Sequence, residues 1–183
     1  IMNVGMNPSR TGVLDALKKM GANIEVKNQR LESGEPCADL IVKKSKLKGV
    51  KLSGKIIPNI IDEIPIISIA AAFADGETII RDAIELRVKE SDRLKAVSEG
   101  FSALGIMHKN FEDGMSIQGS SNQLLTGQSI SIESYDDHRI AMSFLIAGLK
   151  CLNPITVRDC ENIFTSFPNF IDLISSVGYE LKK

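Results

Sequence analysis

Two stretches of the sequence repeat the same order of features, and this repeat limits the folds open to the chain. Each copy begins with acidic residues, continues through a run that is apolar on nearly every helical side, and ends in a strand-like run closed by Arg-Asp. The copies span residues 62–82 and 137–159. A helix that is apolar all round must be buried. We therefore predict buried helices over 66–74 and 140–149.

A second pattern, an amphipathic helix followed by a glycine and a strand, occurs three times, over 14–24, 97–107 and 171–181. Glycine often ends a helix because it adopts left-handed backbone angles easily. Together the two patterns predict βαβαββ units, two of them complete and a first one that lacks its opening helix. Units of this size must share a core. We predict one α/β domain over 1–183, with repeated βαβαββ units packed around buried helices.

The remaining pattern predicts the other elements. Amphipathic helices are expected over 13–20 and 91–104 and after Ser166-Phe167-Pro168, and a hairpin turn at Asp113-Gly114. Polar loops are expected over 29–36 and 119–128, and one or two strands within 50–57. Further strands are expected over 1–4, 23–26, 39–43, 77–81, 106–110, 114–118, 129–133, 155–158 and 179–181.

Residues 87–93, Arg-Val-Lys-Glu-Ser-Asp-Arg, combine three cations with two carboxylates before an amphipathic helix. Residues three and four apart are neighbours on a helix, so we predict Lys89, Glu90 and Arg93 on one side of its first turn. A first turn has free N–H groups and favours anions. Such a place suits a phosphorylated or carboxylated ligand. A solvated charged turn is the other interpretation, and matching pieces elsewhere must decide between them.

Charge and cysteine content exclude several classes. The chain has 22 Lys and Arg against 23 Asp and Glu, which argues against nucleic acid held by bulk charge. The apolar runs are shorter than the roughly 20 residues that a bilayer requires. The three cysteines have no zinc-ligand spacing and no even count for a disulfide framework. We expect no metal, cofactor, nucleic acid or membrane partner, and a cytoplasmic location.

Two motifs, residues 87–93 and Asp137-His138-Arg139-Ile140-Ala141-Met142, resemble the signature of the 5-enolpyruvylshikimate-3-phosphate synthase family. Residues 62–65 and 166–168 add to the resemblance, which covers essentially all of 1–183. It implies two similar domains, each an inside-out α/β barrel of three βαβαββ units around buried parallel helices. This chain would be the C-terminal domain, with the N-terminal half absent.

The resemblance also implies a reaction, a step of aromatic amino-acid biosynthesis by the shikimate pathway. The enolpyruvyl group of phosphoenolpyruvate moves to the 5-hydroxyl of shikimate 3-phosphate, and phosphate leaves, without a metal or cofactor. The implied phosphoenolpyruvate ligands are Arg93 and Arg139. Asp62 and Lys89 would contact shikimate 3-phosphate, and Asp62 and Glu90 would carry the proton transfers.

Three further residues belong to the implied site with open roles. Asp137, like Asp62, could simply cap a buried helix, since Asp is a preferred cap. His138 could carry a proton or serve as a hydrogen-bonded structural residue. Thr165 departs from the family pattern, because many members have a lysine there that contacts phosphoenolpyruvate. A divergent subgroup with such a motif includes members that tolerate the inhibitor glyphosate.

Two alternatives stay open. UDP-N-acetylglucosamine enolpyruvyl transferase has the same fold and donor, and a non-catalytic repeat module could bind anions or protein partners. Under the main interpretation the partners are phosphoenolpyruvate, shikimate 3-phosphate and the chain's own N-terminal domain, in a monomer. The isolated chain, with half a cleft, is expected to be nearly inactive.

Overall fold

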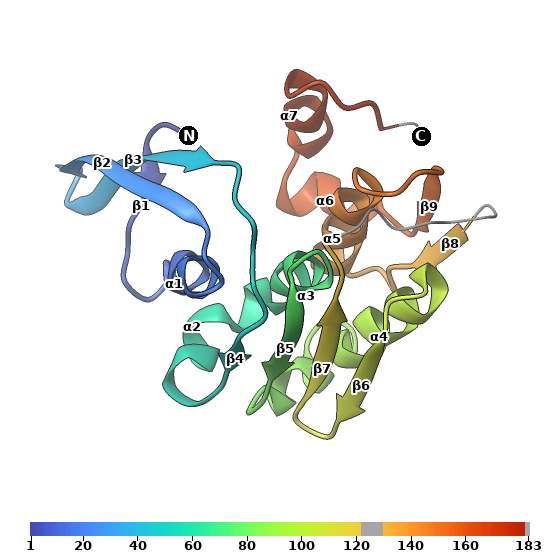
Figure 1. Cartoon of the computed structure of the whole chain (residues 1–183). Helices are drawn as coiled ribbons and strands as arrows, with labels where there is room; N and C mark the ends of the chain where they lie inside the picture. The colour runs from blue at the N-terminus through green and yellow to red at the C-terminus, as the bar shows by residue number, and fades with distance from the viewer. Residues whose placement is uncertain (122–129, 182–183) are drawn as a thin grey trace.

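The computed structural model describes residues 1–121 and 130–181. Figure 1 shows β1–β3 and α1 as one lobe, a sheet with α3 and α4 beside it, and the C-terminal helices α6 and α7 on the far side from α1. The described strands form one antiparallel, one mixed and one parallel sheet, so the chain is an α/β protein. No helix in the two described ranges combines the length and the apolar character needed to cross a membrane.

The N-terminal lobe is an antiparallel sheet in the order β1-β3-β2, with α1 beside it. Its elements are β1 (Val4–Gly5), α1 (Gly12–Lys19), β2 (Asn23–Glu32) and β3 (Glu35–Lys43). The predicted loop over 29–36 is wrong, because the two strands continue through it. Only Ser33 and Gly34 form the turn, with φ angles of 51° and 86°. A two-residue turn of this conformation matches the twist of a hairpin.

The second lobe is a four-stranded sheet in the order β4-β5-β7-β6. Only Lys51–Leu52 of the predicted strand region 50–57 forms a strand, because Gly54 begins a helical segment. Buried α3 matches the prediction for 66–74, with Pro65 in its first turn. The elements are β4 (Lys51–Leu52), η1 (Gly54–Ile56), α2 (Ile57–Ile60), η2 (Ile61–Glu63), α3 (Ile64–Ala72), β5 (Gly76–Ile80), η3 (Ile84–Val88), α4 (Arg93–Leu104), β6 (His108–Phe111) and β7 (Gly114–Gly119).

The third lobe pairs β8 and β9 in parallel, with α5 beside β9 and α6 beside α5, and α7 lies beyond α6. Its elements are β8 (Ile130–Glu133), α5 (His138–Gly148), β9 (Ile155–Arg158), α6 (Glu161–Ser166) and α7 (Phe170–Ser176). The predicted strand over 179–181 is wrong. A strand needs a neighbour to pair its backbone groups, and no described strand pairs with this segment. Most of the loop predicted over 119–128 lies outside the described residues.

The two long sequence copies share an unusual backbone feature. Asp82 and Asp159, the last residues of the Arg-Asp pairs, have left-handed φ angles of 63° and 55°. Three glycines that follow the amphipathic helices, Gly21, Gly105 and Gly178, also have positive φ. The repeated Arg-Asp pairs and the repeated glycines therefore correspond to repeated local backbone conformations.

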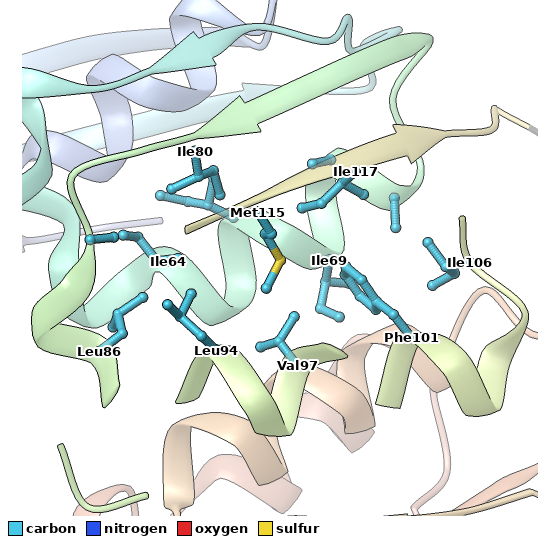
Figure 2. Close-up of a cluster of buried hydrophobic side chains, with 14 of the residues drawn as sticks. Ile64, Ile69, Ile80, Leu86, Leu94, Val97, Phe101, Ile106, Met115 and Ile117 are labelled. Carbon is cyan, nitrogen blue, oxygen red and sulfur yellow. The ribbon is translucent and has the colours of Figure 1, made fainter. Parts of the chain in front are cut away.

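The main core lies where α3 and α4 pack against the β5–β7 side of the sheet (Figure 2). Helix α4 also approaches α5 very closely. A Cβ built on Gly100 would lie 2.1 Å from Cζ of Phe144, a ring that is fully buried. Phe101 contacts the same ring edge-on, with centroids 6.2 Å apart. This tight packing holds the middle of α4 against the middle of α5.

Candidate active site

Arg93, the first residue of α4, is the centre of a charged cluster and is only 1% exposed. Its Nε donates to Oδ2 of Asp137 at 2.7 Å. Its Nη1 reaches Oδ1 of Asp62 at 3.3 Å, and its Nη2 reaches Oε2 of Glu90 at 2.5 Å. One guanidinium therefore joins carboxylates that precede α3, α4 and α5.

Asp137 is fully buried and has two tasks. Its Oδ1 accepts the backbone N–H groups of Arg139 and Ile140 at 2.9 and 3.4 Å, which makes it the N-cap of α5. Its Oδ2 accepts from Arg93 and, at 3.1 Å, from the hydroxyl of Ser91. The capping interpretation is thus confirmed for Asp137, and the same side chain also neutralises a buried cation.

Asp62 lies in η2 and faces three cations. Besides Arg93, its carboxylate is 3.7 Å from Nη2 of Arg139 and 3.6 Å from Nζ of Lys89. Asp62 makes no side-chain cap to α3, whose N-cap position is Glu63, so the capping interpretation is wrong for Asp62. Arg139 is also held by the backbone oxygen of Asp62 at 3.1 Å and by Oε1 of Glu63 at 3.3 Å.

Lys89 and Glu90 lie between η3 and α4, not on the helix itself. The helix begins only at Arg93 because Asp92, one residue earlier, is its N-cap and accepts from the N–H of Lys95. The prediction that Lys89 and Glu90 lie in the first turn is therefore wrong. They reach the cluster all the same, and Lys89 also pairs with Glu85 at 2.8 Å.

We term these residues the ion-pair cluster; its members are Asp62, Glu63, Glu85, Lys89, Glu90, Arg93, Asp137 and Arg139. Three cations are set against five carboxylates. The cations converge from separate elements, which suits a ligand with two or more anionic groups. The carboxylates that now neutralise these cations must give way to such a ligand.

The cations keep the two central aspartates ionised. Burial alone would raise the pKa of Asp62, but the positive charges of Arg139, Lys89 and Arg93 lower it overall. Burial also acts to raise the pKa of Asp137, and there the hydrogen bond and charge of Arg93, with two backbone N–H groups, lower it overall. Both side chains are therefore carboxylates at neutral pH.

The structure brings six of the eight predicted site residues together, namely Asp62, Lys89, Glu90, Arg93, Asp137 and Arg139. His138 is next to them in α5, half-buried, with no side-chain hydrogen bond to the described residues. Thr165 is exposed on α6 and has no hydrogen bond to the cluster within the described ranges. In these ranges no three His, Cys, Asp or Glu side chains are arranged to hold a metal ion.

Three contributors were missed from the sequence: Glu63, Glu85 and Ser91. Glu63 directly follows Asp62, and Glu85 precedes Lys89 by four residues, a spacing that allows an ion pair on a helical turn. These two signals were present in the sequence. The contact of Ser91 with Asp137 joins residues 46 positions apart and had no local signal.

Solved structures and curated relatives match nearly the whole chain. An EPSP synthase structure from Acinetobacter baumannii superimposes with a TM-score of 0.93 at 44% identity, covering 98% of this chain and 41% of that one. The enolpyruvyl transferase NikO from Streptomyces tendae, at 20% identity, has a TM-score of 0.66 over 92% of this chain and 35% of its own, a likeness of fold alone.

Two relatives named 3-phosphoshikimate 1-carboxyvinyltransferase show the same coverage. The protein of Magnetococcus marinus is 48% identical over 180 residues, and that of Geobacter sulfurreducens is 50% identical over 178 residues. These matches cover 98% and 97% of this chain but only 40% and 41% of the relatives. The chain thus spans about two fifths of their length.

A family model described as EPSP synthase (3-phosphoshikimate 1-carboxyvinyltransferase) matches residues 1–174. The match includes every member of the ion-pair cluster. Together with relatives about half identical over almost the entire sequence, it shows that this chain belongs to the EPSP synthase family.

Proposed function

We propose that residues 1–183 are the C-terminal domain of a two-domain cytoplasmic enzyme that transfers the enolpyruvyl group of phosphoenolpyruvate to the 5-hydroxyl of shikimate 3-phosphate. One observation carries the proposal: Arg93, buried, joins carboxylates from three parts of the chain beside two further cations. Membership of the EPSP synthase family supports it, and so does the coverage of two fifths of the relatives.

In this proposal the domain is an inside-out α/β barrel of βαβαββ units around α3 and α5. Burial of α3 on nearly every side supports this arrangement. So do the matching left-handed aspartates, Asp82 and Asp159, at the same place in two units. The missing N-terminal domain would close the other side of the cleft, and we expect the full enzyme to act as a monomer.

Phosphoenolpyruvate carries a phosphate and a carboxylate, and Arg93 and Arg139 are proposed to bind them. Each guanidinium lies in the first turn of its helix, where backbone dipoles also favour an anion. Asp62 and Glu63 form ion pairs with Arg139, and Glu90 forms an ion pair with Arg93. Ligand binding therefore exchanges these carboxylates for substrate oxygens, so that no cation is left without a partner.

Lys89 and Asp62 are proposed to face shikimate 3-phosphate. In the addition step a base takes the proton of the 5-hydroxyl, and an acid protonates the methylene carbon of phosphoenolpyruvate, giving a tetrahedral intermediate. Elimination then expels phosphate and returns a proton from the methyl group. Asp62 suits the base because its lowered pKa keeps it ionised. Glu90, half exposed at the edge of the cluster, is the second proton carrier.

Supporting roles are proposed for the remaining residues. Asp137 holds Arg93, and we propose that His138 and Thr165 belong to the margin of the same site. Thr165 stands where many family members have a lysine, so we propose that Arg93 and Arg139 carry a larger share of donor binding in this protein.

The test is phosphate release by the full-length protein from phosphoenolpyruvate with either shikimate 3-phosphate or UDP-N-acetylglucosamine as acceptor. We expect release with shikimate 3-phosphate only, and its loss in Asp62→Ala and Arg93→Ala. Release with the sugar nucleotide alone would transfer the proposal to that acceptor. A folded wild-type protein that binds phosphoenolpyruvate without releasing phosphate from either pair would make the chain a non-catalytic anion-binding module.

The 183-residue chain in the same assay is expected to be nearly inactive. Positioning from one side of a cleft forfeits most of the proximity effect, which is worth up to roughly 7–11 kcal/mol in well-oriented reactions. Turnover by the isolated chain at the rate of the full-length protein would contradict the two-domain proposal.

A further inference from the structure

The turn that leads into Asp137 has an unfavourable backbone conformation. Tyr135 and Asp136 have φ angles of 58° and 56°, and within the described residues they are the only two adjacent non-glycine residues with positive φ. Asp tolerates this region, but a bulky residue such as tyrosine is rare there. Strained backbone persists only where its surroundings hold it, and it is often found at functional sites. The question is what holds this turn.

Hydrogen bonds fix the turn at each of its residues. The carbonyl of Ser134 accepts the N–H of Asp137 at 3.1 Å and closes the turn. The hydroxyl of Ser134 donates to the carbonyl of Asp159 at 2.7 Å. The phenol of Tyr135 donates to a carboxylate oxygen of Glu99, and Nδ2 of Asn162 donates to the carbonyl of Asp136 at 2.5 Å. Side chains of α4 and α6 thus both form hydrogen bonds with this turn.

The Tyr135–Glu99 bond ties together the same two elements that the Arg93–Asp137 pair joins. Arg93 and Glu99 are both on α4, and Tyr135 and Asp137 are both in the turn. One tie lies in the interior, and the other lies at the surface, where Tyr135 is exposed. The two contacts join the turn to α4 at separate points, so the Tyr135–Glu99 bond restrains the same turn that carries Asp137.

A surface depression of about 240 Å³ adjoins the surface tie. It is lined by Glu90, Ser91, Asp92, Lys95 and Tyr135. Glu90 and Ser91 contact Arg93 and Asp137 respectively, so the depression opens directly beside the cluster. Movement of Tyr135 into or out of this depression would change the position of Asp137.

We propose that Tyr135 and Glu99 are positioning residues: their hydrogen bond holds the left-handed turn so that Asp137 keeps the Arg93 guanidinium in its binding orientation. This inference rests on the proposed function for its consequence, which is the affinity for phosphoenolpyruvate. Its structural part, the link from Tyr135 to Arg93, stands on the geometry alone.

The experiment measures the hydrogen-exchange rate of the Arg93 Nε–H by NMR in the full-length protein without substrates. Arg93→Lys identifies the signal by its loss. Tyr135→Phe, which removes only a hydroxyl, and Glu99→Leu are each expected to speed exchange by about fivefold, the scale of coupling within one hydrogen-bond network. Their double variant should be no faster than either one. Glu99→Gln, whose amide oxygen still accepts, and Tyr179→Phe, the matched control, should keep the wild-type rate.

The same variants are then compared for the KM of phosphoenolpyruvate, which should rise in Tyr135→Phe and Glu99→Leu while Glu99→Gln restores it. Equal exchange rates in wild type and Tyr135→Phe, or additive effects in the double variant, would overturn the positioning role. A wild-type protein that releases no phosphate would refute the proposed function only, because the exchange rates would still decide the link between Tyr135 and Arg93.

Discussion

Replacing Asp137 by asparagine tests the central contact of the cluster with little change of shape. Arg93 and Asp137 are 1% and 0% exposed, and breaking such a buried pair from one side costs about 3–5 kcal/mol. Two features favour the lower end of this range of energies. Asp62 and Glu90 still face Arg93, and an asparagine oxygen can still accept the N–H of Arg139. We expect Asp137→Asn to lose about 3 kcal/mol of local stability.

Asp137→Ala, which also removes the cap of α5, should cost about 1 kcal/mol more. The assay is hydrogen exchange of backbone amides in α4 and α5 of the full-length protein, because it reports local opening without assuming one unfolding step. A double-mutant cycle with Arg93→Met should show strong coupling between the two residues. The double variant Arg93→Met/Asp137→Asn should lose less stability than the sum of the losses in the two single variants. Asp159→Asn is the control. A loss under about 1 kcal/mol in Asp137→Asn, or an additive cycle, would refute the reasoning.

Three further predictions follow from packing and charge. Gly100→Ala should lower the thermal midpoint in calorimetry, because a Cβ there meets buried Phe144 and overpacking costs about 1–3 kcal/mol. Glu85→Gln should lower the KM of shikimate 3-phosphate about two- to threefold, the scale of an exposed ion pair, because it releases Lys89. Acid should weaken the fold through Asp137. Its lowered pKa gives stability that is complete above the unfolded-state value of about 4 and is lost as pH falls through the folded-state value.

Each of these three predictions can be contradicted by a specific result. An unchanged midpoint in Gly100→Ala would mean that the ring of Phe144 moves aside freely. Glu77→Gln, an exposed change elsewhere, is the control for Glu85→Gln, and equal KM values in the two would show that Glu85 does not restrain Lys89. In acid, the thermal midpoint of Asp137→Asn should fall less steeply than that of wild type as the pH drops below about 4. Parallel curves would contradict the assignment.

Local patterns predicted the parts of the fold whose signals are themselves local. The all-round apolar run after Pro65 predicted buried α3. Asp113-Gly114 predicted the β6–β7 hairpin, but its turn residues are Glu112 and Asp113, and Gly114 begins β7. The glycine after α4 has the left-handed conformation expected of a helix end. The repeated Arg-Asp pairs coincide with a repeated left-handed backbone conformation, at Asp82 and Asp159. The cluster arginines followed from motifs in the sequence together with the family resemblance.

Two of the misses, segment 179–181 and Ser91, have one physical cause: partners distant in sequence decide the outcome. Residues 30–32 pair with residues 35–37 as strands because a hairpin with exposed faces needs no apolar alternation. Segment 179–181 has a strand-like sequence but no described partner strand. Lys89 and Glu90 were predicted in the first turn of α4, but Asp92 is the N-cap and the helix begins later, at Arg93. Ser91 joined the cluster through a contact that no spacing rule contains.

The most direct test of the account is the rate of phosphate release by the full-length protein with Arg139 replaced by alanine. Arg139 is partly exposed, so its loss should spare the fold while removing a cation that holds the donor. Wild type should release phosphate from phosphoenolpyruvate and shikimate 3-phosphate, and Arg139→Ala should be slower by about 10²–10³-fold, the scale for one charge-stabilising group. Arg158→Ala, at an exposed arginine outside the cluster, should keep the wild-type rate. Equal rates in wild type and Arg139→Ala would contradict the claim that the ion-pair cluster is half of the active site.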